Sequence, residues 1–477
     1  MGKSSAILER LFALRRSGTD VRTEVLAGLT TFLTMAYILF VQPAVLSGAL
    51  FGTPTGMDFG AVAAATAISA AVASAVMALY ARYPIAQAPG MGENFFFVLT
   101  AIPAAAAAGH PEPWRAALGM VFLSGVLFLT LSFFGVRERI LDALSPSLRG
   151  AIAAGIGLFI AFIGLQNTGV IVRDPGSAVR LNPSLLSPDL LVFGVGLVTA
   201  VGLHARRLRG ALVAGIAAAL ATSLALRAGA ALLPALSGCE AMRTSMLLTR
   251  FAPSARMVSL PPSLTPTFLK MDVAAALSPA LLPLMLVFLF MVLFDTVGTL
   301  VGVSQRAGML VDGKLPRARQ ALASDAIGTM AGAALGTSTV TSYIESAAGV
   351  AQGGRTGLTA LTVAFLFLGS LFFTPLVAMV GSYPPVTAPA LVLVGALMMG
   401  ASREIAWEDP TEAVPAFAVL AGIPLTYSIA DGLALGFLAY PAIKLLAGRG
   451  REVPALLHVL GVVLALYLVL VRGGVLG

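Results

Sequence analysis

The chain has 477 residues, of which 58% are hydrophobic and only 11% are charged, and its mean hydropathy is +0.93. Soluble globular proteins carry about 25% charged residues, so this composition excludes an ordinary soluble domain and indicates a polytopic membrane protein. The net charge of +8 falls mostly in short loops, where it orients the protein, and we do not interpret it as nucleic-acid binding. The single Cys239 excludes an intrachain disulfide and a cysteine-based metal cluster.

The apolar segments fit transmembrane helices, which need roughly 17–25 residues to cross a hydrocarbon core of about 30 Å. The alternation of polar and apolar residues that marks β-barrel strands is absent. The first predicted span covers residues 24–47, and residues 1–22 form a basic segment without the apolar core of a signal peptide. Its charges place the N-terminus in the cytoplasm, with residues 7–14 as an amphipathic helix on the membrane surface.

Seven segments are predicted between residues 23 and 232. After a second span at 60–81, the third segment, 83–100, is broken by Pro and Gly before a short helix that begins near Glu93. The remaining spans are predicted at 115–134, 148–172, 190–204 and 210–232. Under this alternation, two basic clusters fall on the cytoplasmic side: Arg137, Arg139 and Arg149, and Arg206, Arg207 and Arg209.

Residues 233–279 are predicted to be an external connector with a Pro-rich insertion, and residues 280–447 hold the second set of segments. The predicted segments are 280–303, 321–335, the broken segment 335–357, 358–380, 389–401, 414–427 and 432–447. The basic residues Arg306, Lys314, Arg317, Arg319, Lys444, Arg449 and Arg451 again fall inside. The tail, 448–477, contains an apolar stretch at 455–471 that the sequence does not assign as a span.

The stretch from 335 to 357, LGTSTVTSYIESAAGVAQGGRTG, differs from a lipid-facing helix. Small and hydroxylated residues precede Glu345, and a turn rich in Ala and Gly follows it. Irregular backbone at membrane depth is tolerated only where protein or a watery cavity satisfies its polar groups. Half-helices that meet a carboxylate near the bilayer midplane indicate the binding site of a transporter.

The two halves of the chain repeat one pattern: a long span, another helix, and then a broken half-helix that carries Glu93 or Glu345. An odd number of segments per half inverts the second half relative to the first. The sequence therefore predicts an all-α polytopic membrane protein with about 14 transmembrane segments, arranged as two inverted repeats of seven with broken third and tenth segments.

Five strings resemble the AzgA-type adenine/guanine/hypoxanthine permeases of the nucleobase–cation symporter superfamily. They are RTEVLAGLTTFLTMAYILFVQP (22–43), PIAQAPGMGENFFF (84–97), GAIAAGIGLFIAFIGLQNTG (150–169), FDTVGTL (294–300) and GTSTVTSYIESAAGVAQGGRTGLT (336–359). The resemblance implies a core domain and a gate domain, a homodimer, and a site comprising Asn94, Asp295 and Glu345. In two places this chain departs from the pattern of such relatives: Val292 replaces an acid, and Glu93 replaces an apolar residue.

The residues near the predicted site suit a flat heterocycle with donors and acceptors around its edge. A carboxylate such as Glu345 or Glu93 accepts two hydrogen bonds from a guanine-type edge, and the Asn94 amide pairs with a mixed edge. Phe95 and Phe96 offer rings for stacking. Ser342 and Thr34 complete the predicted substrate-binding set. The rival interpretations are helix capping for Glu93 and Asn94, backbone satisfaction for Thr34, core packing for the rings, and structural pairing for Asp325 and Arg355.

Burial also suits these acids to carry a coupling proton, because a carboxylate removed from water prefers its neutral, protonated form. We predict that Glu345 binds substrate while Asp295 or Glu93 carries the proton, although these roles are interchangeable among the three. Sodium is the alternative coupling ion. Its ligands would be the carboxylates and the oxygens of residues 337–342. The sequence does not separate proton from sodium.

The leading hypothesis is proton-coupled uptake of purine nucleobases (adenine, guanine, hypoxanthine) by a multi-pass protein of the inner (cytoplasmic) membrane. The alternatives are transport of xanthine, uracil or another small solute on the same fold, and less favourably an anion exchanger or a channel. Acids in both broken segments disfavour an anion. We expect no enzyme activity, cofactor or bound metal, because the sequence holds no nucleophile–base pair, phosphate loop or metal-ligand cluster.

Overall fold

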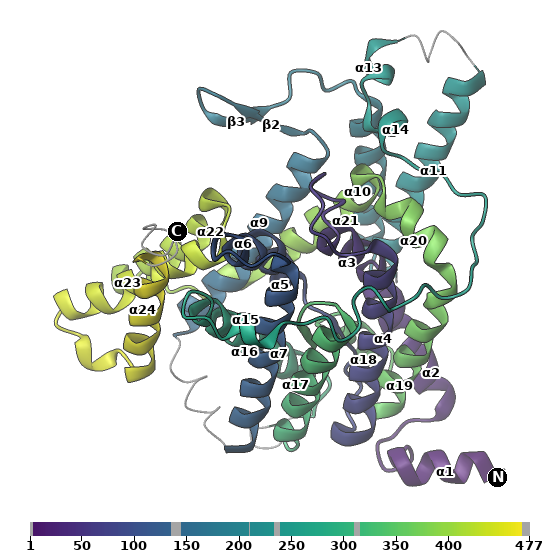
Figure 1. Cartoon of the computed structure of the whole chain (residues 1–477). Coiled ribbons are helices and arrows are strands. Elements are labelled where there is room, and N and C mark those ends of the chain that lie inside the picture. Colours follow the sequence, from purple (N-terminus) through teal and green to yellow (C-terminus); the bar gives the residue numbers. More distant parts are fainter. Residues whose placement is uncertain (1–2, 135–144, 209, 233–238, 310–314, 470–477) are drawn as a thin grey trace.

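The computed structural model describes residues 3–134, 145–208, 210–232, 239–309 and 315–469, and nearly all of its regular structure is helical (Figure 1). Within these ranges, ten helices of 18 to 26 residues are apolar enough to cross a membrane. They share a sequence of high mean hydropathy with few charges, which confirms a multi-pass helical membrane protein. Met1, Gly2, Arg137, Arg139, Arg209, Lys314 and part of the predicted segment 455–471 lie outside the described residues.

The helices of the first half follow the predicted order. The elements of this half are α1 (Lys3–Phe12), α2 (Val21–Met35), α3 (Ile38–Leu46), α4 (Phe59–Val76), β1 (Gln87–Pro89), α5 (Met91–Phe96), α6 (Ile102–Ala107), α7 (Pro113–Phe134), α9 (Pro146–Asn167), β2 (Ile171–Asp174), β3 (Ala178–Leu181), α10 (Pro188–Ala205) and α11 (Ala211–Leu232). Helix α9 ends at Asn167, and an unpredicted β2–β3 hairpin begins within the predicted span 148–172. The helices α2 and α3 together form the first span, 21–46. Their starts match side-chain caps: Asp20 caps α2, Asp58 caps α4 and Ser187 caps α10.

The second half begins with three short helices in the connector and then long ones. They are α13 (Glu240–Arg243), α14 (Met246–Thr249), α15 (Val273–Ala276), α16 (Leu282–Arg306), α17 (Ala318–Leu335), β4 (Val340–Ser342), α18 (Ser346–Ala351), α19 (Gly357–Ser370), α20 (Thr374–Gly381), α21 (Pro384–Met398), α22 (Pro410–Thr426), α23 (Ile429–Leu446) and α24 (Ala455–Tyr467). The apolar helix α24 packs against α23 and α16.

The two broken segments meet through their extended parts. Strands β1 and β4 pair antiparallel, with Gln87 opposite Ser342 and Pro89 opposite Val340, and all six residues are buried. Two further backbone bonds extend the pairing, from Gly90 N to Thr339 O at 2.9 Å and from Tyr343 N to Ala86 O at 3.0 Å. The prediction of an all-α fold therefore needs two corrections. Buried strands join the half-helices, because two unwound backbones satisfy each other's polar groups. A second strand pair, the β2–β3 hairpin, follows α9.

The outer edges of these two strands are satisfied in the same way in each half. Ser74 on α4 accepts from Gln87 N at 2.9 Å and donates to Gln87 O at 3.0 Å. Thr329 on α17 accepts from Val340 N at 3.2 Å and donates to Val340 O at 2.9 Å. A hydroxyl on the preceding helix thus replaces the missing neighbouring strand in both halves, which is why each buried edge is tolerated.

The long helices pack in two groups. One group contains α2, α3, α4, α7, α16, α17, α18 and α19 around the β1–β4 pair, and the other contains α9, α10, α11, α21, α22 and α23. Within the second group, close approach requires small residues: a Cβ on Gly157 would lie 2.7 Å from Gly395 O, and one on Gly395 would lie 2.3 Å from Gly157 O. The β2–β3 hairpin projects from the end of the molecule opposite α1 (Figure 1).

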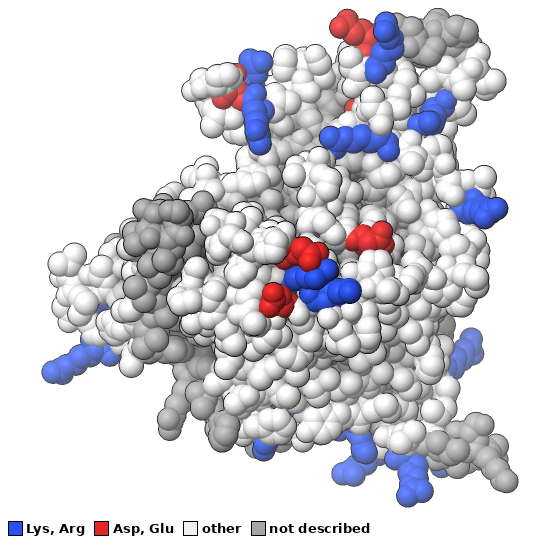
Figure 2. Space-filling model, viewed as in Figure 1, with Lys and Arg blue, Asp and Glu red and all other residues white. Residues whose placement is uncertain are grey.

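Charge is concentrated away from the middle of the molecule. Figure 2 shows that most of the visible surface is uncharged, with basic side chains at both ends, acidic ones beside them at the upper end, and a few acidic and basic side chains near the middle of the face in view. This distribution matches a protein whose middle contacts hydrocarbon.

Candidate functional site

Three acids from distant parts of the sequence converge beside the β1–β4 pair. Glu93 lies in the first turn of α5, Asp295 in the middle of α16, and Glu345 at the N-cap of α18. Thr341 on β4 donates to Asp295 Oδ2 at 2.9 Å. Asp295 is close enough to both Glu93 and Glu345 for electrostatic repulsion. We call these three acids, with Asn94 and Ser342, the central site.

Glu345 is held by the first span. The hydroxyl of Tyr37 donates to Glu345 Oε1 at 2.9 Å. Thr34, one turn earlier, donates to Thr31 O at 2.7 Å, whereas its distance to Glu345 O is 3.5 Å. Thr34 therefore contacts the backbone beside Glu345, but its main partner is its own helix, as the rival interpretation expects.

Glu93 folds back over the start of its own helix. Its side chain is 3% exposed, and a Cβ placed on Gly90 would lie 2.3 Å from Glu93 Oε2 and 3.2 Å from the Thr341 methyl group. Only glycine leaves room for this carboxylate at the N-terminus of α5, where a negative charge is favoured. Glu93 thus occupies a capping position and at the same time faces Asp295.

Asn94 presents a donor with no partner. Its Oδ1 accepts a hydrogen bond from Ser338, which also accepts one from Gln42 Nε2 at 3.1 Å, so the oxygen end is fixed. Its Nδ2 is fully buried and has no hydrogen-bond partner. A buried donor without a partner costs about 1–3 kcal/mol, which a ligand acceptor would offset.

Ser342 belongs to a neighbouring network centred on Asp325. The fully buried Asp325 carboxylate accepts from Ser342 Oγ at 2.9 Å, Ser342 N at 3.0 Å and Thr296 Oγ1 at 2.5 Å, and also from Gln87 Nε2. It joins β1, β4, α16 and α17. The network holds β1 and β4 together on one side of β4. Thr341 and Asp295 lie on the other side of that strand.

The fold and the family of this chain are known from comparison with other proteins. A family model described as "Permease family" (Xan_ur_permease) matches residues 22–435. The chain belongs to this permease family. It is therefore a transporter and not an enzyme.

Among the relatives of this permease is a putative permease of Methanocaldococcus jannaschii, MJ0326, which is 46% identical over 98% of this chain and 99% of its own. The guanine/hypoxanthine permease PbuG of Bacillus subtilis is 41% identical over 98% of this chain and 100% of its own. The adenine permease AdeP of Escherichia coli is 38% identical over 96% of each chain.

Solved structures also share the fold of this permease. The transmembrane domain of the cyanobacterial bicarbonate transporter BicA superposes with a TM-score of 0.60 over 87% of this chain and 97% of its own, at 14% identity. SLC26A9 superposes with a TM-score of 0.58 over 92% of this chain and 69% of its own, at 12% identity. At these identities the likeness concerns the fold alone.

The two predicted stacking rings of this permease have different surroundings. Phe96 packs edge-on against Phe288 with ring centroids 4.6 Å apart, in the core between α5 and α16. Phe95 contacts Phe51 at 6.1 Å and Phe159 at 6.4 Å. Both are fully buried. Phe95 lies on the side of α5 that faces α9.

Part of the central site is exposed. Asp295 and Gly298 are exposed on α16, Glu345 is half-buried, and Ile344 is 47% exposed. A Cβ on Gly298 would meet nothing within 4 Å. This accessible stripe continues from Asp295 toward the C-terminal end of α16, and Gly302 lies on it.

Two acids have structural roles. Asp325 has the structural pairing that was expected of it, and it is the centre of a buried network. Glu24, which was not singled out, is fully buried and accepts from Arg355 N at 2.8 Å, Thr356 N at 3.2 Å and Thr359 Oγ1 at 2.6 Å. Glu24 thus accepts hydrogen bonds from backbone N–H groups at the start of α19, which would otherwise lack partners. The signal available in the sequence was an acid inside an apolar helix.

Arg355 has the structural role that was expected of it. Its guanidinium donates to Val350 O at 2.7 Å and Gly354 O at 2.8 Å, at the C-terminal end of α18. Within the described ranges, no group of three or more His, Cys, Asp or Glu side chains is arranged to hold a metal ion.

Proposed function

We propose that this permease imports purine nucleobases across the cytoplasmic membrane together with protons. The observation that carries the proposal is the meeting of Glu93, Asp295 and Glu345 beside two broken segments, without a recorded ion pair to any described Lys or Arg. Uncompensated acids at membrane depth are costly and mark substrate or ion pathways. The permeases PbuG and AdeP, whose names give guanine, hypoxanthine and adenine, support a purine as the substrate.

The hydrogen-bonding groups of the central site suit a purine edge. Glu345, oriented by Tyr37, would accept two hydrogen bonds from an N–H and amino pair. The free Nδ2 of Asn94 would donate to a ring nitrogen or carbonyl. The Ser342 hydroxyl donates to Asp325, so we propose that Ser342 affects substrate binding indirectly, by fixing the position of β4. Of the two rings, Phe95 is better placed to cover a bound base, because Phe96 is engaged by Phe288.

We assign ion coupling to the same acids. Asp295 is accessible and faces Glu93, so a proton on either one would relieve their repulsion. Glu345 would then remain free to accept from the substrate. Because Asp295 and Glu93 lie together, the proton is shared between them in this proposal, and either residue carries it.

The arrangement of helices supports alternating access. We propose 14 segments in two inverted repeats, 23–232 and 280–447, because Ser74 and Thr329 hold β1 and β4 in the same manner. The group around the β1–β4 pair would be the core domain and the α9–α11 and α21–α23 group the gate domain. The α1 end, with its basic segment, would face the cytoplasm. Because an acid facing lipid is costly, the accessible stripe at Asp295 would line an inward-open passage.

Transport of an anion, such as the bicarbonate in the name of BicA, is less well supported. An anion site between two half-helix N-termini requires local positive charge. Here Glu93 and Glu345 occupy the starts of α5 and α18, where they would repel an anion. The following experiment distinguishes transport of purines from transport of xanthine or uracil, and proton coupling from sodium coupling.

The test is uptake of radiolabelled adenine, guanine, hypoxanthine, xanthine and uracil into proteoliposomes under an imposed proton or sodium gradient. We expect saturable purine uptake that a proton gradient drives, and loss of that uptake in Glu345→Gln. Glu112→Gln is the matched control, because Glu112 forms a solvent-exposed ion pair with Arg115. Absence of saturable base uptake under every gradient would refute the proposed function, and dependence on sodium alone would refute the proton.

A further inference from the structure

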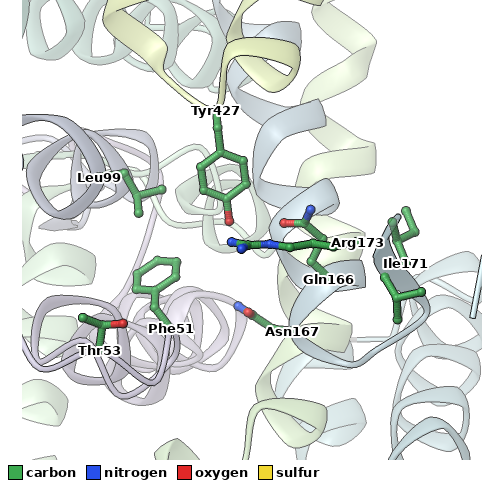
Figure 3. A pocket seen from close by; sticks show the side chains of 9 residues that line it. Phe51, Thr53, Leu99, Gln166, Asn167, Ile171, Arg173 and Tyr427 are labelled. Carbon is green, nitrogen blue, oxygen red and sulfur yellow. The ribbon is translucent and has the colours of Figure 1, made fainter. Parts of the chain in front are cut away.

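A cavity lies beside strand β2, and none of the central-site residues line it. It has a volume of about 470 Å³, and Figure 3 shows side chains that line it. Its lining includes Phe51, Leu99, Gln166, Asn167, Arg173 and Tyr427. We call it the outer vestibule. Its volume is within the range of about 300–1,000 Å³ that small-molecule sites occupy.

Aromatic rings close the vestibule toward the central site. Phe51 contacts Phe95 with centroids 6.1 Å apart, Phe95 contacts Phe159 at 6.4 Å, and Phe159 contacts Tyr427 at 5.2 Å. Phe95 and Phe159 are fully buried, and Phe95 directly follows Asn94 in α5. A solute in the vestibule is therefore separated from Asn94 by one layer of rings.

Tyr427 is fixed in the vestibule by its backbone. It ends α22 with φ at +55°, a left-handed conformation that costs a non-glycine residue about 1–2 kcal/mol. Edge contacts with Phe159 and Phe162 hold its ring. Figure 3 shows the Tyr427 ring pointing toward the guanidinium of Arg173, and the two groups interact electrostatically. Strain of this kind is commonly retained at functional positions.

The vestibule offers hydrogen-bond donors that are not in use. Arg180 and Asp174 form an ion pair at 3.5 Å across the β2–β3 hairpin, whereas no recorded ion pair or hydrogen bond within the described ranges engages the Arg173 guanidinium. Asn167 Nδ2 is buried without a hydrogen-bond partner. No acid is among the residues that line the cavity. The vestibule therefore suits a ligand with acceptors along one edge.

These features specify the class of ligand. A guanidinium donates two parallel hydrogen bonds to the O6 and N7 acceptors of a 6-oxopurine, whereas adenine presents an amino donor at position 6. Phe51 and Tyr427 provide rings for stacking. We propose that the outer vestibule is an entry site that binds 6-oxopurine bases through Arg173 before they reach the central site. This inference rests on the proposed purine uptake and adds a separate site to it.

The experiment measures occupancy of the vestibule directly. Thr53 lines the cavity and is exposed, so Thr53→Cys in a Cys239→Ser background places one thiol there for a membrane-impermeant maleimide. We expect hypoxanthine to slow labelling, and adenine to do so only at about tenfold higher concentration, since one bidentate pair discriminates bases by about 1–3 kcal/mol. Addition of Arg173→Ala should raise the protecting hypoxanthine concentration about tenfold by the same estimate. Arg180→Ala, on the same hairpin, should not.

The Glu345→Gln background separates the vestibule from the central site. Protection by hypoxanthine should persist there, even though uptake is lost. If Glu345→Gln abolishes protection, the labelling reports only the central site and the inference is overturned. Normal uptake without protection also overturns it while leaving the proposed function intact. Absence of uptake in the unmodified protein with protection retained would instead refute the proposed function alone.

Discussion

Tyr37 and Glu345 lie 308 positions apart, yet the Tyr37 hydroxyl donates a 2.9 Å hydrogen bond to the Glu345 carboxylate. Tyr37 stands between α2 and α3, where a short turn interrupts the first span, and Glu345 stands between β4 and α18. This bond therefore joins the first span to the second broken segment. It also fixes the orientation of the acid that we assign to the substrate.

Tyr37→Phe removes this bond and leaves the ring in place. We expect the KM for purine uptake to rise about tenfold, because a hydrogen bond to a charged group contributes about 1.5–3 kcal/mol. Uptake kinetics in proteoliposomes measure the change. Tyr80→Phe is the matched control, since Tyr80 is 49% exposed. An unchanged KM in Tyr37→Phe would show that Glu345 needs no such orientation.

Gly90→Ala should displace Glu93 without disturbing the backbone. The φ of Gly90 is −72°, which alanine also adopts, but its Cβ would lie 2.3 Å from Glu93 Oε2. We expect uptake to fall by about 10- to 100-fold, because misplacing a binding group by about 1 Å costs that much. The melting temperature should change little. Gly194→Ala in α10, where a Cβ meets nothing within 4 Å, should retain full uptake. Full uptake in Gly90→Ala would exclude Glu93 from the mechanism.

Asp325→Asn should destabilise the fold. The carboxylate accepts four hydrogen bonds, including one from Thr296 at 2.5 Å, and an amide nitrogen would face some of these donors. Each unsatisfied buried donor costs about 1–3 kcal/mol. We expect a clearly lower melting temperature in detergent, together with loss of uptake. Asp58→Asn should melt like the original protein, because asparagine caps a helix about as well as aspartate. Equal melting of Asp325→Asn would contradict a structural role for this network.

The cluster of Asp409, Arg449 and Glu452 should give the protein a pH-dependent stability. Hydrogen bonds from Thr411 and Arg449 lower the pKa of Asp409 to about 2, and bonds from Arg449 and Lys444 lower the pKa of Glu452 to about 2. A lowered pKa stabilises the folded state above the ordinary carboxyl pKa, and this contribution is lost as the pH falls toward 2.

Arg449→Gln is therefore expected to lower the melting temperature at pH 6, and the difference from the original protein should shrink as the pH approaches 2. Arg451→Gln, which removes a neighbouring exposed charge, should have no such effect. Thermal melting across this pH range measures both. A difference that stays constant with pH would show that Arg449 acts through packing instead.

Much of the fold followed from the residues alone. The apolar segments predicted the long helices to within a few residues, and the Pro and Gly residues before Glu93 predicted the first break. Glu93, Asp295 and Glu345, which were predicted to share one site, lie close together in the structure. The partners of Asp325 and Glu24 were not predicted, because an acid inside a helix shows its partners only when other segments are placed around it. Five separate segments line the outer vestibule, and no pattern in the sequence predicted it.

By itself, the sequence determined that this protein spans a membrane and that acids interrupt its spans, because hydropathy and helix-breaking residues act locally. Only the tertiary structure decided which groups face one another: that β1 pairs with β4, that Tyr37 orients Glu345, and that Phe95 contacts Phe51 in the lining of the outer vestibule. The reason is physical. Hydrogen bonds and ring contacts between residues hundreds of positions apart depend on how helices pack, and packing is a property of the whole chain.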